Sequence, residues 1–452
     1  MSAFWTGDLE KTISDAHGVA APLIGSPHLS AWLQGYHADA PVSSNMGSQD
    51  LPLQRWMKFK EAFSPKFVVD ALASMPHTPR RCVDPFGGSG TTALTCSFLG
   101  IDSVSIEVNP FLADLIEAKL KPPSAFELSA SYAAVLERAR SCDCDTEAHI
   151  RRLPSSFCEP SAPNASQREC RFLFWREALT RIIALKVAVE SCENEHSKRL
   201  LRVLLGSILV PASNVVVNGK GRRYRGRWSK RRIWASDVDR LFSESVERAA
   251  RDLGAFGRRS RASATVLRGD SRMLAPGIGP FDCAIFSPPY PNSFDYTDVY
   301  NLELWVLGYL EDAAANRALR RSTVRSHVQV SFDEPLLEPS GLLQATVERL
   351  KGARPNLWDS RIPEMVLGYF EDMAVIMSAL HAQITPGGRV VTVIGDSQYA
   401  GVQVDVAAII REQSEAIGFS TVSTRAIRSM RSSPQHGGFH DLAETCLVLE
   451  RG

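Results

Sequence analysis

The fold is decided by the stretch Phe281-Asp282-Cys283-Ala284-Ile285-Phe286-Ser287-Pro288-Pro289-Tyr290, a short apolar run that ends in an abrupt turn. Gly279-Pro280 precedes the run and two prolines follow it, as expected for a central strand of a sheet. Consecutive prolines fix two φ angles and cannot continue the hydrogen-bond ladder of a sheet. The turn therefore holds a hydroxyl, a carbonyl and an aromatic ring at the carboxyl end of a strand, where open α/β sheets bind their ligands.

A second stretch, Val83-Asp84-Pro85-Phe86-Gly87-Gly88-Ser89-Gly90-Thr91-Thr92, predicts a glycine-rich turn between a strand that begins at Arg81 and a helix over 93–100. Glycines let the backbone approach a ligand closely, and the start of a helix offers free N–H groups. The next predicted strand, Ser103–Glu107, ends in a carboxylate. An acid at that point of a strand–helix–strand unit hydrogen-bonds ribose hydroxyls, whereas a solvated strand end is the simpler alternative.

The sequence of the glycine-rich turn indicates a ligand that carries no phosphate. The turn lacks the Gly-Lys-Ser/Thr ending of a phosphate-binding loop. It begins with Asp84-Pro85, whose carboxylate would repel a pyrophosphate and would suit a cationic amino-acid group. S-adenosyl-L-methionine fits that description. Asp270 follows the predicted strand that begins at Ala264, and it is placed either to accept from the adenine amine of the same cofactor or simply to form a turn.

The remaining pattern alternates helices and strands. Ser64-Pro65 predicts a helix start, because serine is a favoured cap and proline a favoured first residue. Later elements are a helix over 363–384, a buried strand over 389–397, a helix over 406–417 and a last strand over 444–449. Such alternation predicts an α/β protein with a doubly wound, mostly parallel sheet, interrupted by a largely helical insertion at 121–262.

The insertion contains a strongly basic segment. Eight basic residues stand between positions 220 and 232, with no acid among them. The predicted nucleic-acid-binding residues are Lys220, Arg222, Arg223, Tyr224, Arg225, Arg227, Trp228, Lys230, Arg231 and Arg232. Cations can grip phosphates and aromatic rings can stack on bases, whereas the alternative is a solvated basic loop. The net charge of the whole chain is only +1, which favours a dedicated patch.

The composition, with 44% hydrophobic and 22% charged residues, is that of a soluble globular protein. No apolar run is as long as a membrane span, and the first residues lack the basic start and apolar core of a signal peptide. We therefore expect a cytoplasmic protein with no membrane contact. Cys142, Cys144, Cys158 and Cys170 do not have the spacing of a recognised zinc module, so we expect no metal site.

The Ser-Pro-Pro-Tyr turn suits one demanding reaction, methyl transfer to an exocyclic amine of a nucleobase. The lone pair of such an amine is delocalised into the ring, which makes it a poor nucleophile. Ser287 Oγ and the Pro288 carbonyl can accept its hydrogens and draw the nitrogen toward an attacking geometry, while Tyr290 stacks on an extruded base. Methylation of cytosine carbon 5 would need a nucleophilic cysteine, typically preceded by proline, and the chain has no Pro-Cys dipeptide.

These motifs together resemble those of the amino-group DNA methyltransferases. The stretch 83–92 resembles their cofactor loop, Ser287-Pro288-Pro289-Tyr290 looks like their catalytic tetrapeptide, and Phe63-Ser64-Pro65-Lys66-Phe67 is similar to their segment beside the methionine end of the cofactor. The resemblance covers roughly 55–120 and 262–450. It implies catalytic residues Ser287, Pro288, Pro289 and Tyr290. It implies that S-adenosyl-L-methionine is held by Phe63, Ser64, Asp84, Pro85, Phe86, Gly87, Gly88, Ser89, Gly90, Thr91, Glu107 and Asp270.

The resemblance also sets expectations for the organisation and the substrate. It implies a Rossmann-like methyltransferase domain at 51–120 and 263–452. The Gly-, Ser-, Pro- and Ala-rich composition of 1–50 predicts a loosely structured arm, and the helical pattern and basic segment of 121–262 make this insertion a candidate DNA-binding or target-recognition region. A leading serine in the tetrapeptide is usual for cytosine-N4 enzymes and a leading aspartate for adenine-N6 enzymes. The expected partners are double-stranded DNA with base flipping and a cognate restriction or defence system. Adenine-N6 methylation, RNA base methylation and a non-catalytic nucleic-acid binder remain alternatives.

Overall fold

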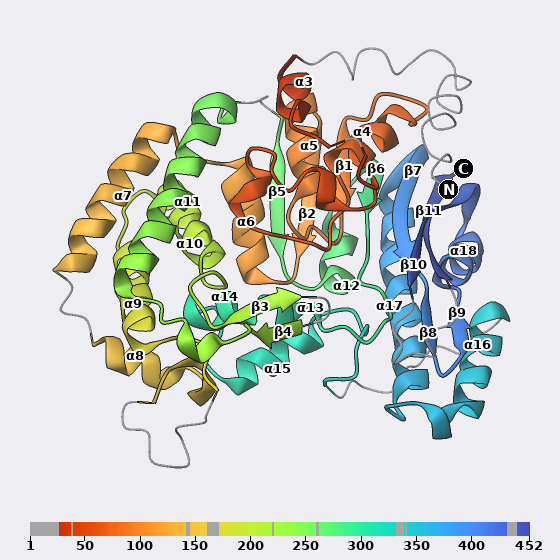
Figure 1. Ribbon diagram of the computed structural model, residues 1–452. Helices are drawn as coiled ribbons and strands as arrows, with labels where there is room; N and C mark the ends of the chain where they lie inside the picture. The colour runs from red at the N-terminus through yellow and green to blue at the C-terminus, as the bar shows by residue number, and fades with distance from the viewer. Residues whose placement is uncertain are drawn as a thin grey trace.

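A computed structural model describes residues 27–37, 39–141, 145–160, 171–218, 221–258, 262–330, 339, 341–431 and 441–452 (Figure 1). Its centre is a seven-stranded sheet in the order β10-β11-β7-β6-β1-β2-β5. The strands are β1 Arg81–Asp84, β2 Asp102–Glu107, β5 Ala264–Arg268, β6 Phe281–Phe286, β7 Ile384–Gly395, β10 Phe419–Arg431 and β11 Asp441–Arg451. Strand β11 runs in the direction opposite to the other six strands of this sheet. The prediction of a doubly wound, mostly parallel α/β fold is confirmed.

Helices cover both faces of the sheet because successive residues of each strand point to opposite faces. Val83, Ala284 and Val390 pack with the helices of one face, and their neighbours Cys82 and Cys283 pack with those of the other. The helices of the first face are α16 Gly341–Gly352, α17 Ile362–Gln383 and α18 Val406–Ile417. Those of the second face are α4 Pro65–Ala73 and α5 Thr91–Leu99. The strand order changes direction between β1 and β6, which is the point where such sheets bind ligands.

Local sequence signals explain where these elements begin and end. Ser64 caps α4, its Oγ accepting from Phe67 N, as the Ser-Pro pair predicts. Helix α17 is long and apolar enough to cross a membrane by length and composition alone. Tyr369, Phe370 and Ile376 of α17 are fully buried against the sheet, as in the core helix of a soluble protein.

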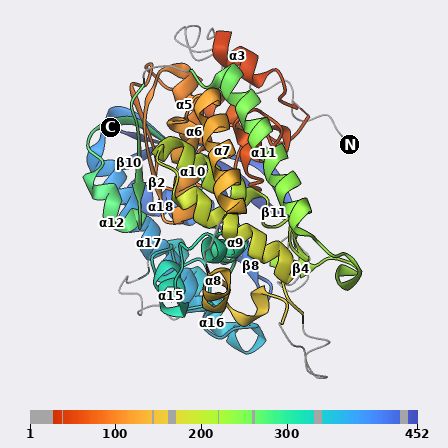
Figure 2. The ribbon, with the colours of Figure 1, turned by 90° about the vertical axis from the view of Figure 1, so that its left-hand side faces the viewer.

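The insertion is largely helical, as predicted. Its helices are α7 Ala125–Arg140, α8 Thr146–Arg152, α9 Arg176–Glu190, α10 Glu195–Ser207 and α11 Ala235–Phe256, and its hairpin is β3 Val215–Asn218 with β4 Gly221–Tyr224. Figure 2 shows α7, α9, α10 and α11 lying side by side. Phe111 and Leu115 of α6 Pro110–Leu120 belong to the same buried cluster as Leu204 of α10. The insertion therefore shares a hydrophobic core with a helix of the sheet domain.

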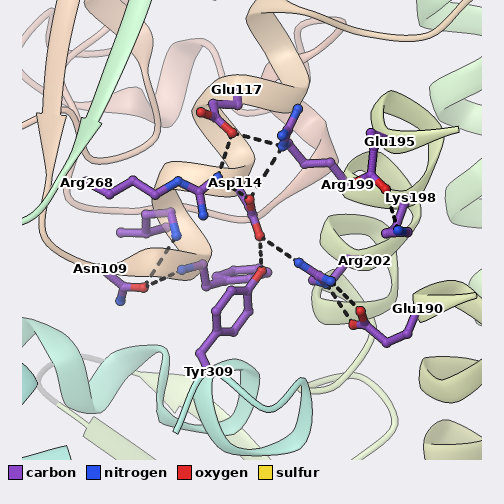
Figure 3. Close-up of polar contacts among 12 residues, drawn as sticks. Asn109, Asp114, Glu117, Glu190, Glu195, Lys198, Arg199, Arg202, Arg268 and Tyr309 are labelled. Carbon is purple, nitrogen blue, oxygen red and sulfur yellow. Dashed lines mark hydrogen bonds and ion pairs between the residues drawn. The ribbon is translucent and has the colours of Figure 1, made fainter. Parts of the chain in front are cut away.

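An ionic cluster also joins α6 to the insertion (Figure 3). Its centre is Asp114 of α6, whose side chain is only 3% exposed. Asp114 pairs with Arg268 of β5 at 2.6 Å, Arg202 of α10 at 3.3 Å and Arg199 of α10 at 3.5 Å, and it accepts from the Tyr309 hydroxyl. One carboxylate thus links the sheet, α6 and the insertion.

Replacing Asp114 by alanine should lower the free energy of unfolding by about 2–3 kcal/mol, because the arginines lose a buried counter-charge but still reach water. Glu195→Ala is the control, since Glu195 pairs with Lys198 on the same insertion but is 68% exposed, and a change of about 0.5 kcal/mol or less is expected. Urea unfolding at neutral pH measures both. Equal effects of the two substitutions would contradict the central role of Asp114.

The arm departs from its prediction. Residues 1–26 and 38 lie outside the described part, but 27–37 and 39–50 are not loosely structured. Helix α3 Pro27–Leu33 places Trp32 in the core at 1% exposure, stacked on Phe98 with ring centroids 4.4 Å apart. Trp32 Nε1 also donates to the Pro52 carbonyl at 2.8 Å. The buried aromatic ring outweighs the glycine- and serine-rich composition around it.

The other differences lie late in the chain. After the Ser-Pro-Pro-Tyr turn the chain forms α13 Tyr296–Val299 and α14 Asn301–Val306. The region 313–360, for which the sequence predicts no role, forms α15 Ala313–Arg321 and α16 in its described part. Strand β10 has no counterpart among the sequence predictions, because much of its polar sequence lies at the exposed edge of the sheet.

Candidate active site

A cavity of about 390 Å³ opens at the carboxyl ends of β1, β2, β5 and β6. It is large enough for a small-molecule ligand, and its position is the one expected for a doubly wound sheet. The sequence-predicted residues that line it are Phe63, Pro85, Phe86, Gly88, Glu107, Asp270, Ser287, Pro288, Pro289 and Tyr290. The structure thus brings the glycine-rich turn, the strand-end acid and the Ser-Pro-Pro-Tyr turn to one cavity.

The other predicted residues lie behind its wall. They are Ser64, Asp84, Gly87, Ser89, Gly90 and Thr91. Asp84 is buried, and its Oδ1 accepts from Phe86 N at 2.9 Å. Burial raises the pKa of Asp84 to about 7. Asp84 thus shapes the turn from inside, and its predicted contact with a cationic part of a ligand stays a prediction.

Two glycines of the turn pack closely against α6. A Cβ atom on Gly87 would lie 2.8 Å from Ile116 Cδ1 of α6, so the end of the Ile116 side chain would have to move to admit it. Gly90 caps α5 with φ 78°, in the left-handed region, and a Cβ there would lie 3.0 Å from Ile116. The turn therefore rests directly on α6, the helix that carries Asp114.

Glu107 joins the two halves of the strand–helix–strand unit. Its Oε2 accepts from Gly88 N at 2.7 Å and its Oε1 accepts from Asn109 N at 2.8 Å. The side chain lines the cavity, and burial raises its pKa to about 7. Each carboxylate oxygen accepts one backbone bond and keeps a lone pair for a ligand hydroxyl.

The raised pKa of Glu107 predicts a pH dependence of stability. A carboxyl group with a raised folded-state pKa contributes stability that is full below its unfolded value of 4.5 and is lost as the pH rises through about 7. Relative to Glu107→Gln, the wild-type protein should lose at most about 3 kcal/mol between pH 4.5 and pH 8. Urea unfolding across this range measures the difference, with exposed Glu137→Gln of α7 as the control. Parallel curves for wild type and Glu107→Gln would rule out the titration.

Asp270 lines the cavity but already has protein partners. It caps α12 Ser271–Leu274, accepting from Arg272 N at 2.9 Å. Its carboxylate also pairs with the Arg272 guanidinium at 2.6 Å, and that guanidinium reaches Asp372 of α17 at 3.1 Å. Asp270 is thus the turn-forming residue of the simpler alternative as well as a cavity acceptor.

The Ser-Pro-Pro-Tyr turn is held by hydrogen bonds to two other strands. Ser287 Oγ donates to the Val393 carbonyl of β7 at 2.8 Å. The Tyr290 hydroxyl donates to Glu444 Oε1 of β11 at 2.9 Å. Tyr290 N donates to the Tyr296 hydroxyl at 3.3 Å. Burial raises the pKa of Tyr290 well above its usual value, so the phenol stays protonated.

Sequence reasoning missed several residues that line the cavity. Glu61, Tyr296, Tyr300, His327 and Glu444 are among them. Glu61 Oε2 accepts from the Tyr300 hydroxyl at 3.1 Å and from Lys60 N at 3.2 Å, and burial raises the pKa of Glu61. None of them has a site role in the sequence predictions, although Glu444 begins the predicted last strand 444–449 and Glu61 precedes the predicted Phe63 by two residues.

The hairpin of β3 and β4, which carries the first residues of the basic segment, lies next to the cavity. Arg222 of β4 pairs with Asp298 of α13 at 3.4 Å, and α13 also contains the cavity residues Tyr296 and Thr297. Lys60, another cavity residue, donates to the Val217 carbonyl of β3 at 2.9 Å. The insertion thus brings its cationic segment to the entrance side of the candidate site.

The side chains of the basic segment differ in how many contacts they make with the rest of the protein. Lys220 lies outside the described residues. Arg225 donates to the Val210 carbonyl at 3.0 Å and to the Ser213 carbonyl at 3.2 Å, so it has a structural role. Arg232 lies over the ring of Trp234 at 4.4 Å, and Arg231 reaches the Pro211 carbonyl at 3.5 Å. Arg223, Arg227 and Lys230 are exposed, and no other described residue pairs with them.

The two rings of the basic segment pack inside the insertion. Trp228 contacts Phe172 at 5.1 Å and Tyr224 at 5.4 Å between ring centroids, and Arg171 covers Tyr224 at 5.4 Å. Both side chains remain partly exposed. That Tyr224 and Trp228 stack on bases stays a prediction.

No group of three or more His, Cys, Asp or Glu side chains within the described ranges could hold a metal ion. Cys142, Cys144 and Cys170 fall outside those ranges, and Cys158 is buried.

Comparison with known proteins finds similarity along most of the chain. None of the protein-family models compared with the chain matches it. The chain is 26% identical over 433 residues to proteins called Type II methyltransferase M.AvaI from Nostoc sp. and Anabaena variabilis, covering 88% of this chain and 86% of each relative. It is 25% identical over 446 residues to Type II methyltransferase M.BsoBI from Geobacillus stearothermophilus, covering 88% of this chain and 85% of the relative.

Proposed function

We propose that the protein transfers a methyl group from S-adenosyl-L-methionine to the exocyclic N4 amine of cytosine in double-stranded DNA. One observation carries the proposal: Ser287 and Tyr290 of the Ser-Pro-Pro-Tyr turn line the same cavity as Glu107 and the glycine-rich turn. Similarity to two kinds of type II methyltransferase over 88% of the chain supports the reaction class and a cognate restriction or defence system as the partner.

The residues of the cavity fit the cofactor. Glu107 keeps one lone pair on each oxygen for the ribose hydroxyls, and Phe63 and Phe86 supply apolar contact area. Glu61 lines the cavity, whereas Asp84 lies behind its wall. Its Oε2 accepts two bonds, but no other described residue donates to Oε1, which leaves this oxygen for the α-ammonium group. When bound, the cofactor supplies an electrophilic methyl group on a sulfonium.

The chain itself prepares the acceptor amine. The single hydroxyl proton of Ser287 points to the Val393 carbonyl at 2.8 Å, so the lone pairs of Oγ remain for the amine hydrogens. The Pro288 carbonyl is the second acceptor, its direction fixed by the proline rings. Holding both amine hydrogens frees the nitrogen lone pair for attack, and positioning in the cavity replaces any covalent intermediate.

The base must leave the duplex to reach the cavity. Enzymes that modify a base in DNA extrude it into a pocket, where an aromatic ring stacks on it. Tyr290 supplies that ring, and the exposed cations Arg223, Arg227 and Lys230 hold the phosphates outside.

Product analysis tests the proposal. The protein is incubated with duplex DNA and methyl-labelled cofactor, and the DNA is digested to nucleosides for mass spectrometry. N4-methylcytosine is the expected product. N6-methyladenine as the sole product would overturn the base assignment, and methylation of RNA alone would overturn the substrate. Binding of DNA without any product would favour the non-catalytic alternative.

A further inference from the structure

Glu444 is a buried carboxylate with no assigned role. It lies on β11, is 5% exposed and lines the cavity. Its Oε1 accepts from the Tyr290 hydroxyl at 2.9 Å, and its Oε2 accepts from Ser43 Oγ at 2.5 Å. Residues from the start, the middle and the end of the chain therefore meet at one side chain.

The partners of Glu444 are specific. Arg428 faces it across the β10–β11 pair and also lines the cavity. No ion pair joins Arg428 to Glu444, and both carboxylate oxygens receive hydroxyl protons from Tyr290 and Ser43. A carboxylate that served only to balance a neighbouring arginine would contact it. The geometry directs Glu444 to the Ser-Pro-Pro-Tyr turn.

The carboxylate also fixes the direction of the hydrogen bonds. An ionised carboxylate can only accept, so the Tyr290 hydroxyl must donate to Glu444. The Tyr290 proton is then unavailable to Ser287 Oγ, which lies 3.4 Å from the phenol oxygen and donates its own proton to Val393 at 2.8 Å. Glu444 thereby pins the far end of the Tyr290 ring and keeps Ser287 in its accepting state.

We propose that Glu444 is a positioning residue for methyl transfer, which orients the Tyr290 ring for the target base, and that Ser43 of the N-terminal segment supports it. This inference rests on the proposed function of the turn. Because a displaced acceptor group slows a reaction without weakening the binding of a remote cofactor, the effect belongs in kcat rather than in cofactor affinity.

A double-mutant cycle tests the inference with purified full-length protein. Glu444→Ala should lower kcat on duplex DNA on the order of 10-fold to 100-fold, with cofactor affinity by calorimetry unchanged within about twofold. Tyr290→Phe keeps the ring but loses the bond, and should lose a similar amount. The double variant should be no slower than either single variant, because both remove the same interaction. Glu444→Gln keeps an accepting oxygen and should stay within about threefold of wild type.

The outcomes separate this inference from the function beneath it. If the losses of kcat caused by Glu444→Ala and Tyr290→Phe multiply in the double variant, the positioning role is overturned. Wild-type kcat in Glu444→Ala alongside an inactive Tyr290→Ala would overturn it as well. Full activity of Tyr290→Ala would instead remove the proposed role of the turn. Should Glu444→Ala fail to fold, the cycle of Ser43→Ala with Tyr290→Phe replaces it. Ser43→Ala should then slow the wild type and leave Tyr290→Phe unchanged, and equal slowing in both backgrounds would overturn the proposal.

Discussion

Replacing Ser287 by alanine is expected to lower kcat for methyl transfer on the order of 10²-fold to 10³-fold, the usual effect of removing one positioned hydrogen-bond partner from a reacting group. Alanine cannot accept an amine hydrogen, so the nitrogen lone pair stays delocalised in the base ring. Ser287 lines the same cavity as Glu107 but is not among the residues proposed to hold the cofactor, so cofactor affinity should change little. Single-turnover kinetics with saturating cofactor measure the methylation step directly.

Two further variants make this result specific. Ser423→Ala removes an exposed hydroxyl from β10 and should behave as wild type. Ser287→Asp retains an acceptor at the same point and should be more active than Ser287→Ala, although the longer side chain shifts the base. A Ser287→Ala enzyme within about threefold of wild type would show that the hydroxyl does not hold the amine.

The second large effect should follow reversal of charge on the basic segment 220–232. The triple substitution Arg223→Glu, Arg227→Glu and Lys230→Glu should weaken DNA binding on the order of 10²-fold to 10³-fold at low salt, because three phosphate contacts become repulsive. These three side chains are the exposed members of the segment with no described partner. The slope of the logarithm of the DNA-binding constant against the logarithm of the salt concentration should become smaller in magnitude by about 3, roughly one unit for each phosphate contact.

The matched control reverses the same number of charges elsewhere. Arg248 and Arg251 of α11 and Lys351 of α16 are exposed and lie on elements outside the hairpin. Their triple substitution by glutamate changes the net charge equally but should leave most of the affinity and the salt slope intact. If both triple variants weaken DNA binding to the same extent, the net charge of the protein rather than the basic segment governs DNA affinity.

The sequence predicts the parts of the site that are local. A strand, a glycine-rich turn and a helix are encoded within about 20 neighbouring positions, and two consecutive prolines mark the end of the strand at the Ser-Pro-Pro-Tyr turn. The strands around Val83, Phe281 and Val390 are predicted for the same reason, since apolar runs bounded by glycine and proline are contiguous in the chain.

The missed residues depend on tertiary contacts instead. Glu444 meets Tyr290 only because β11 lies two strands from β6 in the sheet, and strand order has no local signature. Glu61 likewise acquires its raised pKa from burial beside Tyr300, a residue 239 positions away. The position of Asp84 behind the cavity wall likewise depends on backbone angles inside the turn, which residue type alone does not give.

The shared core beneath the insertion has a calorimetric consequence. A segment that could melt independently would need an interface of modest size and polar character. Here Phe111 and Leu115 on α6 are buried together with Leu204 of α10, and Asp114 anchors the rim. Heating should therefore produce a single cooperative endotherm, and the whole chain should gain heat capacity in one step.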